Sequence, residues 1–146
     1  MEKTPTTLAE FESEAARFTT SLVPREERAT LITLSGELGA GKTAFTKVVA
    51  RTLGVGETVT SPTFVLEKIY SLGGLASKFK RLVHIDAYRL EQGSDLVALG
   101  FDELMQEPGN LILLEWPEKV SDALPIPAVK ISITPQADGS RTISYA

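Results

Sequence analysis

The segment from Gly36 to Thr43 reads Gly-Glu-Leu-Gly-Ala-Gly-Lys-Thr and fits the pattern G-x-x-x-x-G-K-[ST] without a mismatch. Glycines let the backbone fold into a concave turn whose N–H groups point at anionic oxygens. Lys42 can then reach the β- and γ-phosphates of a nucleotide, and the Thr43 hydroxyl can take one coordination position on magnesium. The alternative is an ordinary Gly-rich turn with Lys42 in solvent, but the specified positions favour a P-loop. The expected cradle consists of Gly36, Gly39, Ala40, Gly41, Lys42, Thr43 and Ala44.

Two apolar runs further along the chain, Leu82 to Asp86 and Leu111 to Glu115, each end in a carboxylate. Ligands of an open α/β sheet bind at the carboxyl ends of its strands, so both carboxylates should face the phosphates. Asp86 resembles a Walker-B aspartate. Glu115 could ligate magnesium directly or orient the attacking water, and the sequence leaves these roles open. Either carboxylate could instead only cap the turn after its strand. The candidate catalytic residues are Lys42, Asp86 and Glu115, and the candidate magnesium ligands are Thr43, Asp86 and Glu115.

Two further residues lie next to these carboxylates. His84 lies on the same strand face as Asp86, two residues earlier, and is interpreted as a satisfied core residue with no catalytic role. Trp116 directly follows Glu115 and is either half-exposed in the mouth of the site or buried as an anchor for Pro117.

The flanks of the motif predict a strand on one side and a helix on the other. Residues 29–34 form an uncharged run rich in β-branched residues, which is typical of a strand covered on both faces. After Lys42 the apolar residues recur at helical spacing up to Leu53, and Gly54 stands where a helix C-cap belongs. An earlier helix is predicted from Thr7 to Leu22, closed by Pro24.

The rest of the chain adds short strands and helical turns. We expect strands at 64–70, 128–134 and 141–145, with the first antiparallel to its neighbour and the last two joined at Asp138-Gly139. Short helical turns are expected at 95–99 and 101–106. The predicted fold class is α/β, a single P-loop NTPase domain over residues 1–146 with a mixed, mostly parallel central sheet flanked by helices.

Composition excludes several kinds of chemistry. The 146 residues contain no cysteine and one histidine, so disulfides, zinc–thiolate sites, thiol nucleophiles and histidine clusters are excluded. The formal net charge of −4 predicts that the surface as a whole repels nucleic acid, so any such contact should be local or made through a partner. No apolar run has the roughly 20 residues of a membrane helix, and the N-terminus lacks a signal core, so we expect a cytoplasmic protein.

Four segments taken together resemble the TsaE (YjeE) family of bacterial ATPases, which take part in making threonylcarbamoyladenosine on transfer RNA. They are the motif at 36–43, Thr-Ser-Pro-Thr-Phe at 60–64, His-Ile-Asp-Ala-Tyr-Arg-Leu at 84–90, and Glu-Trp-Pro at 115–117. The resemblance runs from the first helix to the strand at Arg141. It implies a subunit that uses ATP and Mg²⁺ and works with the TsaB and TsaD proteins, TsaD being the one that transfers the threonylcarbamoyl group. Transfer RNA would be met only through the complex, and hydrolysis would be weak without the partners.

The resemblance also implies residue roles. Residues 39–44 match the family's nucleotide loop, Thr43 and Glu115 its magnesium site, and Asp86 its essential aspartate. Ser61, Pro62 and Thr63 match a loop like a GTPase switch I, with an ordinary Pro-containing loop as the alternative. Residues around Thr6 and Thr7 match loosely a region that contacts the base in relatives.

The chain departs from the family at some positions. Many relatives have Asp where Glu37 stands and a hydroxyl residue where Ala44 stands, so a hydroxyl contact to the α-phosphate is lost while the Ala44 N–H remains. The stretch 71–81 and the end after Pro135 carry no matching signature.

Two other protein classes share a P-loop. A small-molecule kinase also needs a lid with several arginines, but the arginines here are scattered, with only Arg25 and Arg28 close together. A regulatory GTPase needs an Asn-Lys-x-Asp segment, and none occurs. The ATPase is therefore favoured, with the kinase as the alternative.

Overall fold

A mixed sheet holds the chain together in a computed structural model, which describes residues 1–57, 59, 66–73 and 78–146. The strand order is β1-β7-β6-β2-β5-β4-β3. The central strands β6, β2, β5 and β4 run parallel, while β3 pairs antiparallel with β4, β7 with β6, and β1 with β7. The strands are β1 Glu2–Lys3, β2 Thr30–Ser35, β3 Glu67–Ser71, β4 Arg81–Asp86, β5 Asn110–Glu115, β6 Val129–Pro135 and β7 Arg141–Tyr145.

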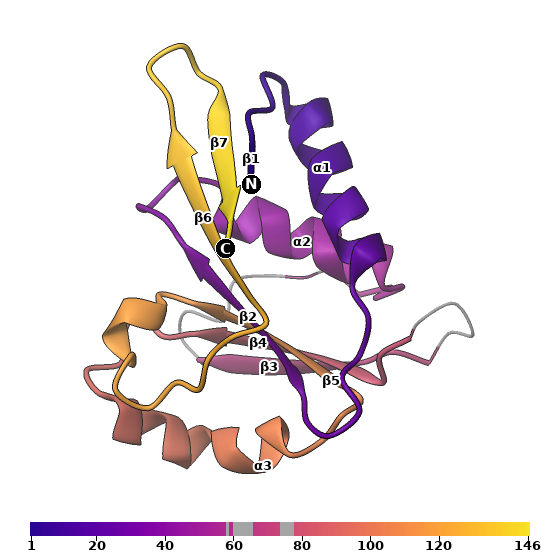
Figure 1. The fold of residues 1–146 in the computed structure, drawn as a ribbon, viewed down its shortest axis with the longest axis vertical. Helices are drawn as coiled ribbons and strands as arrows, with labels where there is room; N and C mark the ends of the chain where they lie inside the picture. The colour runs from indigo at the N-terminus through magenta and orange to yellow at the C-terminus, as the bar shows by residue number, and fades with distance from the viewer. Residues whose placement is uncertain (58, 60–65, 74–77) are drawn as a thin grey trace.

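Helices cover both faces of this sheet (Figure 1). Helix α1 (Leu8–Ser21) and helix α2 (Lys42–Thr52) lie on one face, and the 3₁₀ helix η1 (Gly93–Leu99) and helix α3 (Phe101–Met105) lie on the other. A further 3₁₀ turn, η2 (Pro117–Lys119), follows β5. The predicted α/β class with a central sheet flanked by helices is confirmed.

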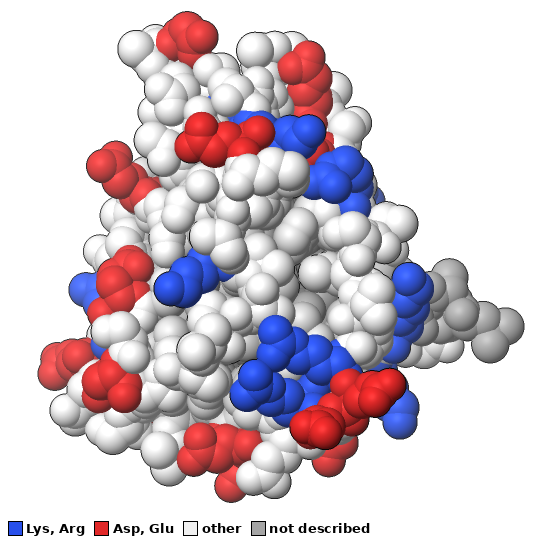
Figure 2. Space-filling model, viewed as in Figure 1, with Lys and Arg blue, Asp and Glu red and all other residues white. Residues whose placement is uncertain are grey.

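Charged side chains of both signs are interspersed on the face drawn in Figure 2. This distribution agrees with the modest net charge of −4. Among the described residues, no helix is long and apolar enough to span a bilayer.

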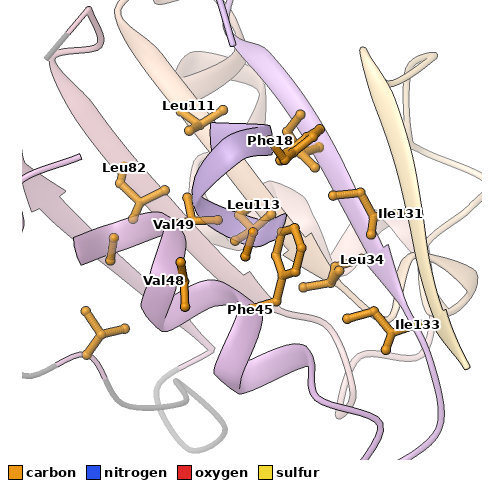
Figure 3. Packing of buried hydrophobic residues seen from close by; sticks show 14 of the residues in the cluster. Phe18, Leu34, Phe45, Val48, Val49, Leu82, Leu111, Leu113, Ile131 and Ile133 are labelled. Carbon is orange, nitrogen blue, oxygen red and sulfur yellow. The ribbon is translucent and has the colours of Figure 1, made fainter. Parts of the chain in front are cut away.

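The burial of each strand reflects how many layers cover it. All residues of β5 are buried, as are those of β2 up to Leu34, because helices pack on both sides. In β6 burial alternates, with Ile131 and Ile133 inward and Lys130 exposed. Phe45 of α2 lies at the centre of the core on the α2 side, surrounded by side chains of β2, β5, β6 and α1 (Figure 3).

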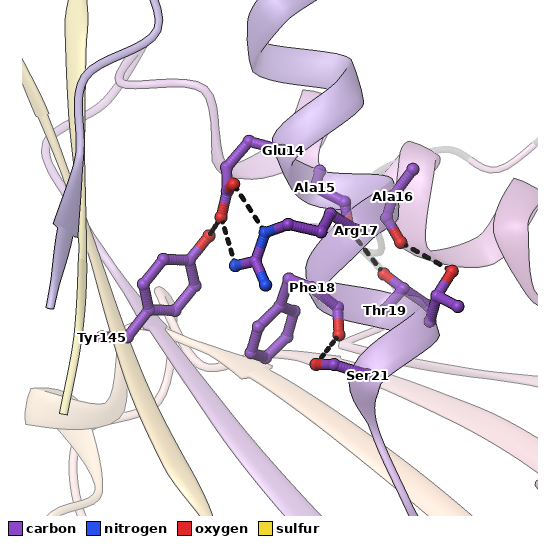
Figure 4. A network of polar contacts seen from close by, with 9 residues as sticks. Glu14, Ala15, Ala16, Arg17, Phe18, Thr19, Ser21 and Tyr145 are labelled. Atoms are coloured by element: carbon purple, nitrogen blue, oxygen red, sulfur yellow. Dashed lines mark hydrogen bonds and ion pairs between the residues drawn. The ribbon is translucent and has the colours of Figure 1, made fainter.

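Helix α1 begins at a capping arrangement and is tied to β7. The Thr7 hydroxyl accepts a hydrogen bond from the Glu10 N–H at 3.1 Å, and the Glu10 carboxylate accepts from the Thr6 N–H at 2.9 Å. Figure 4 shows Glu14 between Arg17 and Tyr145. Its carboxylate accepts two hydrogen bonds from the Arg17 guanidinium, at 2.8 and 2.7 Å, and one from the Tyr145 hydroxyl at 2.5 Å.

Most predicted elements are found within a few residues of their expected bounds. The predicted strand at 64–70 is described only from Glu67 onward, where it pairs antiparallel with β4 as expected. The loop at Ser61 to Thr63 lies outside the described residues. Strand β1 and the η2 turn were not predicted.

Candidate functional site

The Gly-rich segment connects the end of β2 to the start of α2, as the motif predicts. Two of its glycines are required, Gly36 by space and Gly41 by its backbone conformation. A Cβ on Gly36 would lie 2.8 Å from the Ile133 carbonyl oxygen, which is backbone and cannot easily move. Gly41 has φ +117°, a conformation that residues with a side chain rarely adopt. A Cβ there would also lie close to the Arg141 guanidinium and the Phe11 ring, at 3.1 and 3.3 Å.

A cavity of about 350 Å³ opens beside this loop. It brings together residues from the loop, from α2 and from the ends of β4 and β5. Gly36 and Ala40 do not line it: the Gly36 carbonyl accepts a hydrogen bond from Lys42, and the Ala40 side chain is buried in the core. The lining residues are Leu38, Gly39, Gly41, Lys42, Thr43, Ala44, Asp86, Tyr88, Glu115 and Trp116.

Lys42 is almost fully buried within this site, with 6% of the residue exposed. Its ammonium nitrogen donates to the Gly36 carbonyl oxygen and lies 3.4 Å from that of Glu37. The same nitrogen lies 3.7 Å from the centroid of the Trp116 ring, a cation–π arrangement. Burial lowers the pKa of Lys42, while the negative charges of Glu115, Glu118 and Asp86 oppose that shift. An anion in the cavity would favour the charged ammonium further.

Asp86 and Glu115 face each other across neighbouring strands. They are register partners in the parallel β4–β5 pair, and 5% of Asp86 and 2% of Glu115 are exposed. Register partners share a face of the sheet, so both carboxylates point to the α2 side. One Asp86 oxygen accepts from the Tyr88 N–H at 3.0 Å, so Asp86 caps the following turn as well as lining the cavity. The turn-capping interpretation of Asp86 is thus confirmed, and its place in the cavity is compatible with the Walker-B interpretation, which stays a prediction.

Backbone hydrogen bonds join the strand ends that carry these groups. The Trp116 N–H donates to the Leu34 carbonyl at 3.3 Å, and the Ala87 N–H donates to the Glu115 carbonyl at 3.0 Å. The ends of β2, β5 and β4 are thereby connected in series.

The ring of Trp116 lies at the mouth of the cavity. The backbone of Trp116 is left-handed, with φ 60° and ψ 52°, and Pro117 follows as the first residue of η2. Trp116 is half-buried and lines the cavity, and the centroid of its ring lies 5.0 Å from that of the Tyr88 ring. Of the two placements expected for this residue, the half-exposed one at the mouth is confirmed.

Sequence reasoning missed the relation of His84 to the site. His84 is fully buried as expected, but its Nε2 lies 2.6 Å from Oε2 of Glu115. Its position two residues before Asp86, combined with the Asp86–Glu115 register, was the signal that could have found this contact. The register itself is a property of the folded sheet.

A metal ion in this cavity would need ligands besides the His, Asp and Glu side chains of the described residues. Within the described ranges no group of three or more His, Asp or Glu side chains could hold one. The oxygen donors available in the cavity are the Thr43 hydroxyl and the two carboxylates, which suit the hard cation Mg²⁺. Phosphate oxygens and water would complete the coordination, so the residues fit a metal that arrives with a polyphosphate.

A smaller cavity of about 100 Å³ lies at the start of α1, lined in part by Thr6, Thr7 and Arg141. Thr7 caps α1, and Arg141 also approaches Gly41. The loosely matched region near Thr6 and Thr7 is thus close to the Gly-rich loop.

Comparisons with known proteins agree on one family. The family described as "Threonylcarbamoyl adenosine biosynthesis protein TsaE" matches residues 9–143. The "tRNA threonylcarbamoyladenosine biosynthesis protein TsaE" of Treponema pallidum is 38% identical over 133 residues, covering 91% of this chain and 93% of that protein. The protein of the same name from Bacillus subtilis is 40% identical over 115 residues, covering 79% and 68%. The crystal structure of Bacillus subtilis YdiB superimposes with a TM-score of 0.77 at 30% identity, covering 99% of this chain and 83% of that one.

Proposed function

We propose that this chain, which belongs to the TsaE family, binds and hydrolyses Mg–ATP. The family has a role in the biosynthesis of threonylcarbamoyladenosine in tRNA, and ATP hydrolysis would be the contribution of this chain to that process. The observation that carries the proposal is the cavity itself. Lys42 and Thr43 of the Gly-rich segment line it together with Asp86 and Glu115, which are more than 40 residues further along the chain.

Each group in the cavity has a role in this proposal. The backbone N–H groups of the loop and of Ala44 bind phosphate oxygens, and the first turn of α2 adds its positive dipole end. Lys42 contacts the β- and γ-phosphates. The Thr43 hydroxyl, Asp86 and Glu115 hold the magnesium ion, which neutralises charge on the phosphates. The proposed cradle consists of the loop and helix residues that line the cavity, Gly39, Gly41, Lys42, Thr43 and Ala44, while Gly36 and Ala40 support the shape of the loop.

The division of labour between the carboxylates follows from their partners. Each carboxylate has one oxygen engaged, Asp86 by the Tyr88 N–H of the following turn and Glu115 by the His84 ring, so their surroundings distinguish them. Glu115 is the more buried of the two and lies beside β2, which leads into the loop. We assign Glu115 to direct contact with the metal, and Asp86 to a contact through water that also orients the attacking water.

Hydrolysis should be slow in the isolated protein. Among the described residues that line the cavity there is no arginine to stabilise charge in the transition state. We propose that the TsaB and TsaD proteins complete the site in the cytoplasm, and that tRNA is met only through that complex. The net charge of −4, with both signs present on the face drawn in Figure 2, supports indirect contact, because it offers little attraction to a polyphosphate chain.

Measured turnover tests this function. The purified chain should release phosphate from ATP slowly, and adding TsaB and TsaD should raise the rate. Asp86→Asn and Glu115→Gln keep size and remove charge, so each should abolish the stimulated rate while the thermal unfolding curve stays close to wild type. Equal rates with and without the partners would contradict the partner-dependent cycle. Full activity in either variant would remove that residue from the site.

A further inference from the structure

The contact between His84 and Glu115 joins a buried ring to a carboxylate of the proposed site. The Nε2–Oε2 distance is 2.6 Å, and the exposed fractions of the two side chains are 0% and 3%. His84 lies on β4 and Glu115 ends β5, so the contact crosses two neighbouring parallel strands. A hydrogen bond shielded from water in this way is stronger than one at the surface.

The direction of this hydrogen bond follows from the acceptor. A carboxylate that ligates a metal carries no proton and can only accept, so His84 must donate from Nε2. The donation occupies one lone pair of Oε2, so Oε1 is the oxygen better able to bind a ligand in the cavity.

Packing alone is a poor reason for a histidine at this position. The adjoining residues on this face, Leu82 and Leu113, are buried apolar side chains of the core. Within the described part of the chain, the second ring nitrogen, Nδ1, is buried and has no hydrogen-bond partner. Burying a polar atom without a partner costs free energy that a methionine or leucine would not incur. Among the residues that the structure describes, the polar contact of the His84 side chain is the one to Glu115.

We propose that His84 is a positioning residue that fixes the orientation of the Glu115 carboxylate for the metal of the bound nucleotide. The proposal rests on the proposed function, because it needs Glu115 to act on a metal–nucleotide complex. Without the donor at Nε2, the carboxylate could rotate about its side-chain torsions, and fewer molecules would hold Oε1 toward the cavity. Loss of a residue that hydrogen-bonds to a metal ligand typically lowers metal affinity by about 10–100-fold.

Two substitutions separate orientation from packing. His84→Gln keeps an N–H donor near the position of Nε2, and His84→Met keeps a similar volume without a donor. In full-length protein, ATP binding is measured by calorimetry over a range of Mg²⁺ concentrations and again in EDTA. His84→Met should raise the Mg²⁺ concentration needed for half-maximal binding by about tenfold or more, with binding in EDTA unchanged. His84→Gln should stay within about threefold of wild type.

Several outcomes would overturn the proposal. Wild-type Mg²⁺ dependence in folded His84→Met would show that Glu115 needs no such partner, as would equal losses in the Gln and Met variants. If His84→Met does not fold, His84→Asn replaces it, since its amide is too short to reach Glu115 and the same loss is expected. In a Glu115→Gln background the His84→Met change should have no further effect on Mg²⁺ dependence, and an additive effect would also count against the proposal. A wild-type protein whose ATP binding ignores Mg²⁺ would instead refute the proposed function.

Discussion

At the residue scale, the proposed function makes Lys42 the side chain on which phosphate affinity should depend most. Among the described residues, the contacts of its ammonium group are with two backbone carbonyls of the loop and with the Trp116 ring. To bind a nucleotide it must turn from these partners toward the phosphates. The contacts made without nucleotide therefore hold the side chain near its target and keep it from burying an unpaired charge.

Replacing Lys42 with Ala should weaken ATP binding at least tenfold, because a charge-assisted contact is worth about 1.5–3 kcal/mol. Lys42→Arg should not restore affinity, since a planar guanidinium is the wrong shape for the space between the loop carbonyls and the indole ring. Calorimetry measures both variants. Unchanged affinity in Lys42→Ala would show that the loop backbone binds phosphate without this side chain.

Trp116 should report the movement of Lys42. It is the chain's only tryptophan, and the Lys42 ammonium lies 3.7 Å from its ring centroid. When Mg–ATP binds, the Lys42 ammonium should move from the indole toward the phosphates. This movement changes the charge around the indole, so the fluorescence emission of Trp116 should change. The change should weaken in Glu115→Ala, where the metal no longer ties the phosphates to this strand end. Tight binding by calorimetry with emission and iodide quenching unaltered would place the nucleotide away from Trp116.

At the scale of elements, a partly buried acid, Glu14, joins α1 to the last strand. The hydrogen bonds from the Arg17 guanidinium are the largest cause that holds the pKa of Glu14 below its usual value; burial opposes this, and the Tyr145 hydroxyl adds a smaller lowering effect. Phe18 stacks on the Tyr145 ring at 5.2 Å beside this network. The network joins α1 to β7, which lie at opposite ends of the described sequence, so it stabilises the fold through a long-range contact.

This network should give the fold an acid-sensitive component. A depressed pKa in the folded state stabilises the fold above the ordinary glutamate pKa of 4.5, and this stability is lost as pH falls through the folded-state value. Glu14→Gln should lower the free energy of unfolding by about 1–2 kcal/mol at pH 7, and the difference from wild type should shrink as pH falls below that ordinary value. Urea unfolding at a series of pH values measures it.

Glu12→Gln is the matched control on the same helix. Glu12 lies 3.8 Å from Arg51, and both side chains are well exposed, so its loss should cost about 0.5 kcal/mol or less. If the free energy of unfolding shows the same pH dependence in the two variants, the contact of Glu14 with Tyr145 of β7 does not make the fold more acid-sensitive than an exposed ion pair does.

At the scale of the whole molecule, metal and nucleotide should bind as one ligand. The described part of the chain supplies too few acidic or histidine ligands at any one place to hold a cation alone. Mg²⁺ by itself should leave the unfolding temperature unchanged, whereas Mg–ATP at 100 times its dissociation constant should add about 2.7 kcal/mol, a shift of several degrees. Scanning calorimetry with Mg²⁺, ATP in EDTA, and both together measures this. Strong stabilisation by Mg²⁺ alone would reveal a metal site apart from the cavity.

Much of the fold could be predicted because local sequence signals are strong where both faces of a strand are covered. The runs at β2, β4 and β5 are apolar and bounded by turn residues, and the motif places a strand before the loop and a helix after it. Strand β1 was not predicted because its two residues, Glu2 and Lys3, have no local pattern typical of a strand. It is defined only by its pairing with β7.

The site was predicted as a set of residues but not as a set of contacts. Parallel strand ends must meet at one edge of the sheet, so Asp86 and Glu115 could be placed together in advance. Which side chains touch depends on register, and no local pattern specifies that a histidine on β4 reaches the last residue of β5. The hydrogen bond from His84 and the cation–π contact of Trp116 are therefore properties of the folded sheet.

The hydrogen bonds that join the ends of β2, β5 and β4 should couple the segments around the cavity, because the end of β5 takes part in both. The Trp116 N–H is held by the Leu34 carbonyl of β2, and the Ala87 N–H is held by the Glu115 carbonyl of β5. Each proton can exchange with solvent only when its own pair of strand ends separates, so the two protons report on two neighbouring strand pairs. A ligand that stabilises the turn after β4 would hold the end of β5 in place, and should therefore slow exchange of the Trp116 proton as well as that of Ala87.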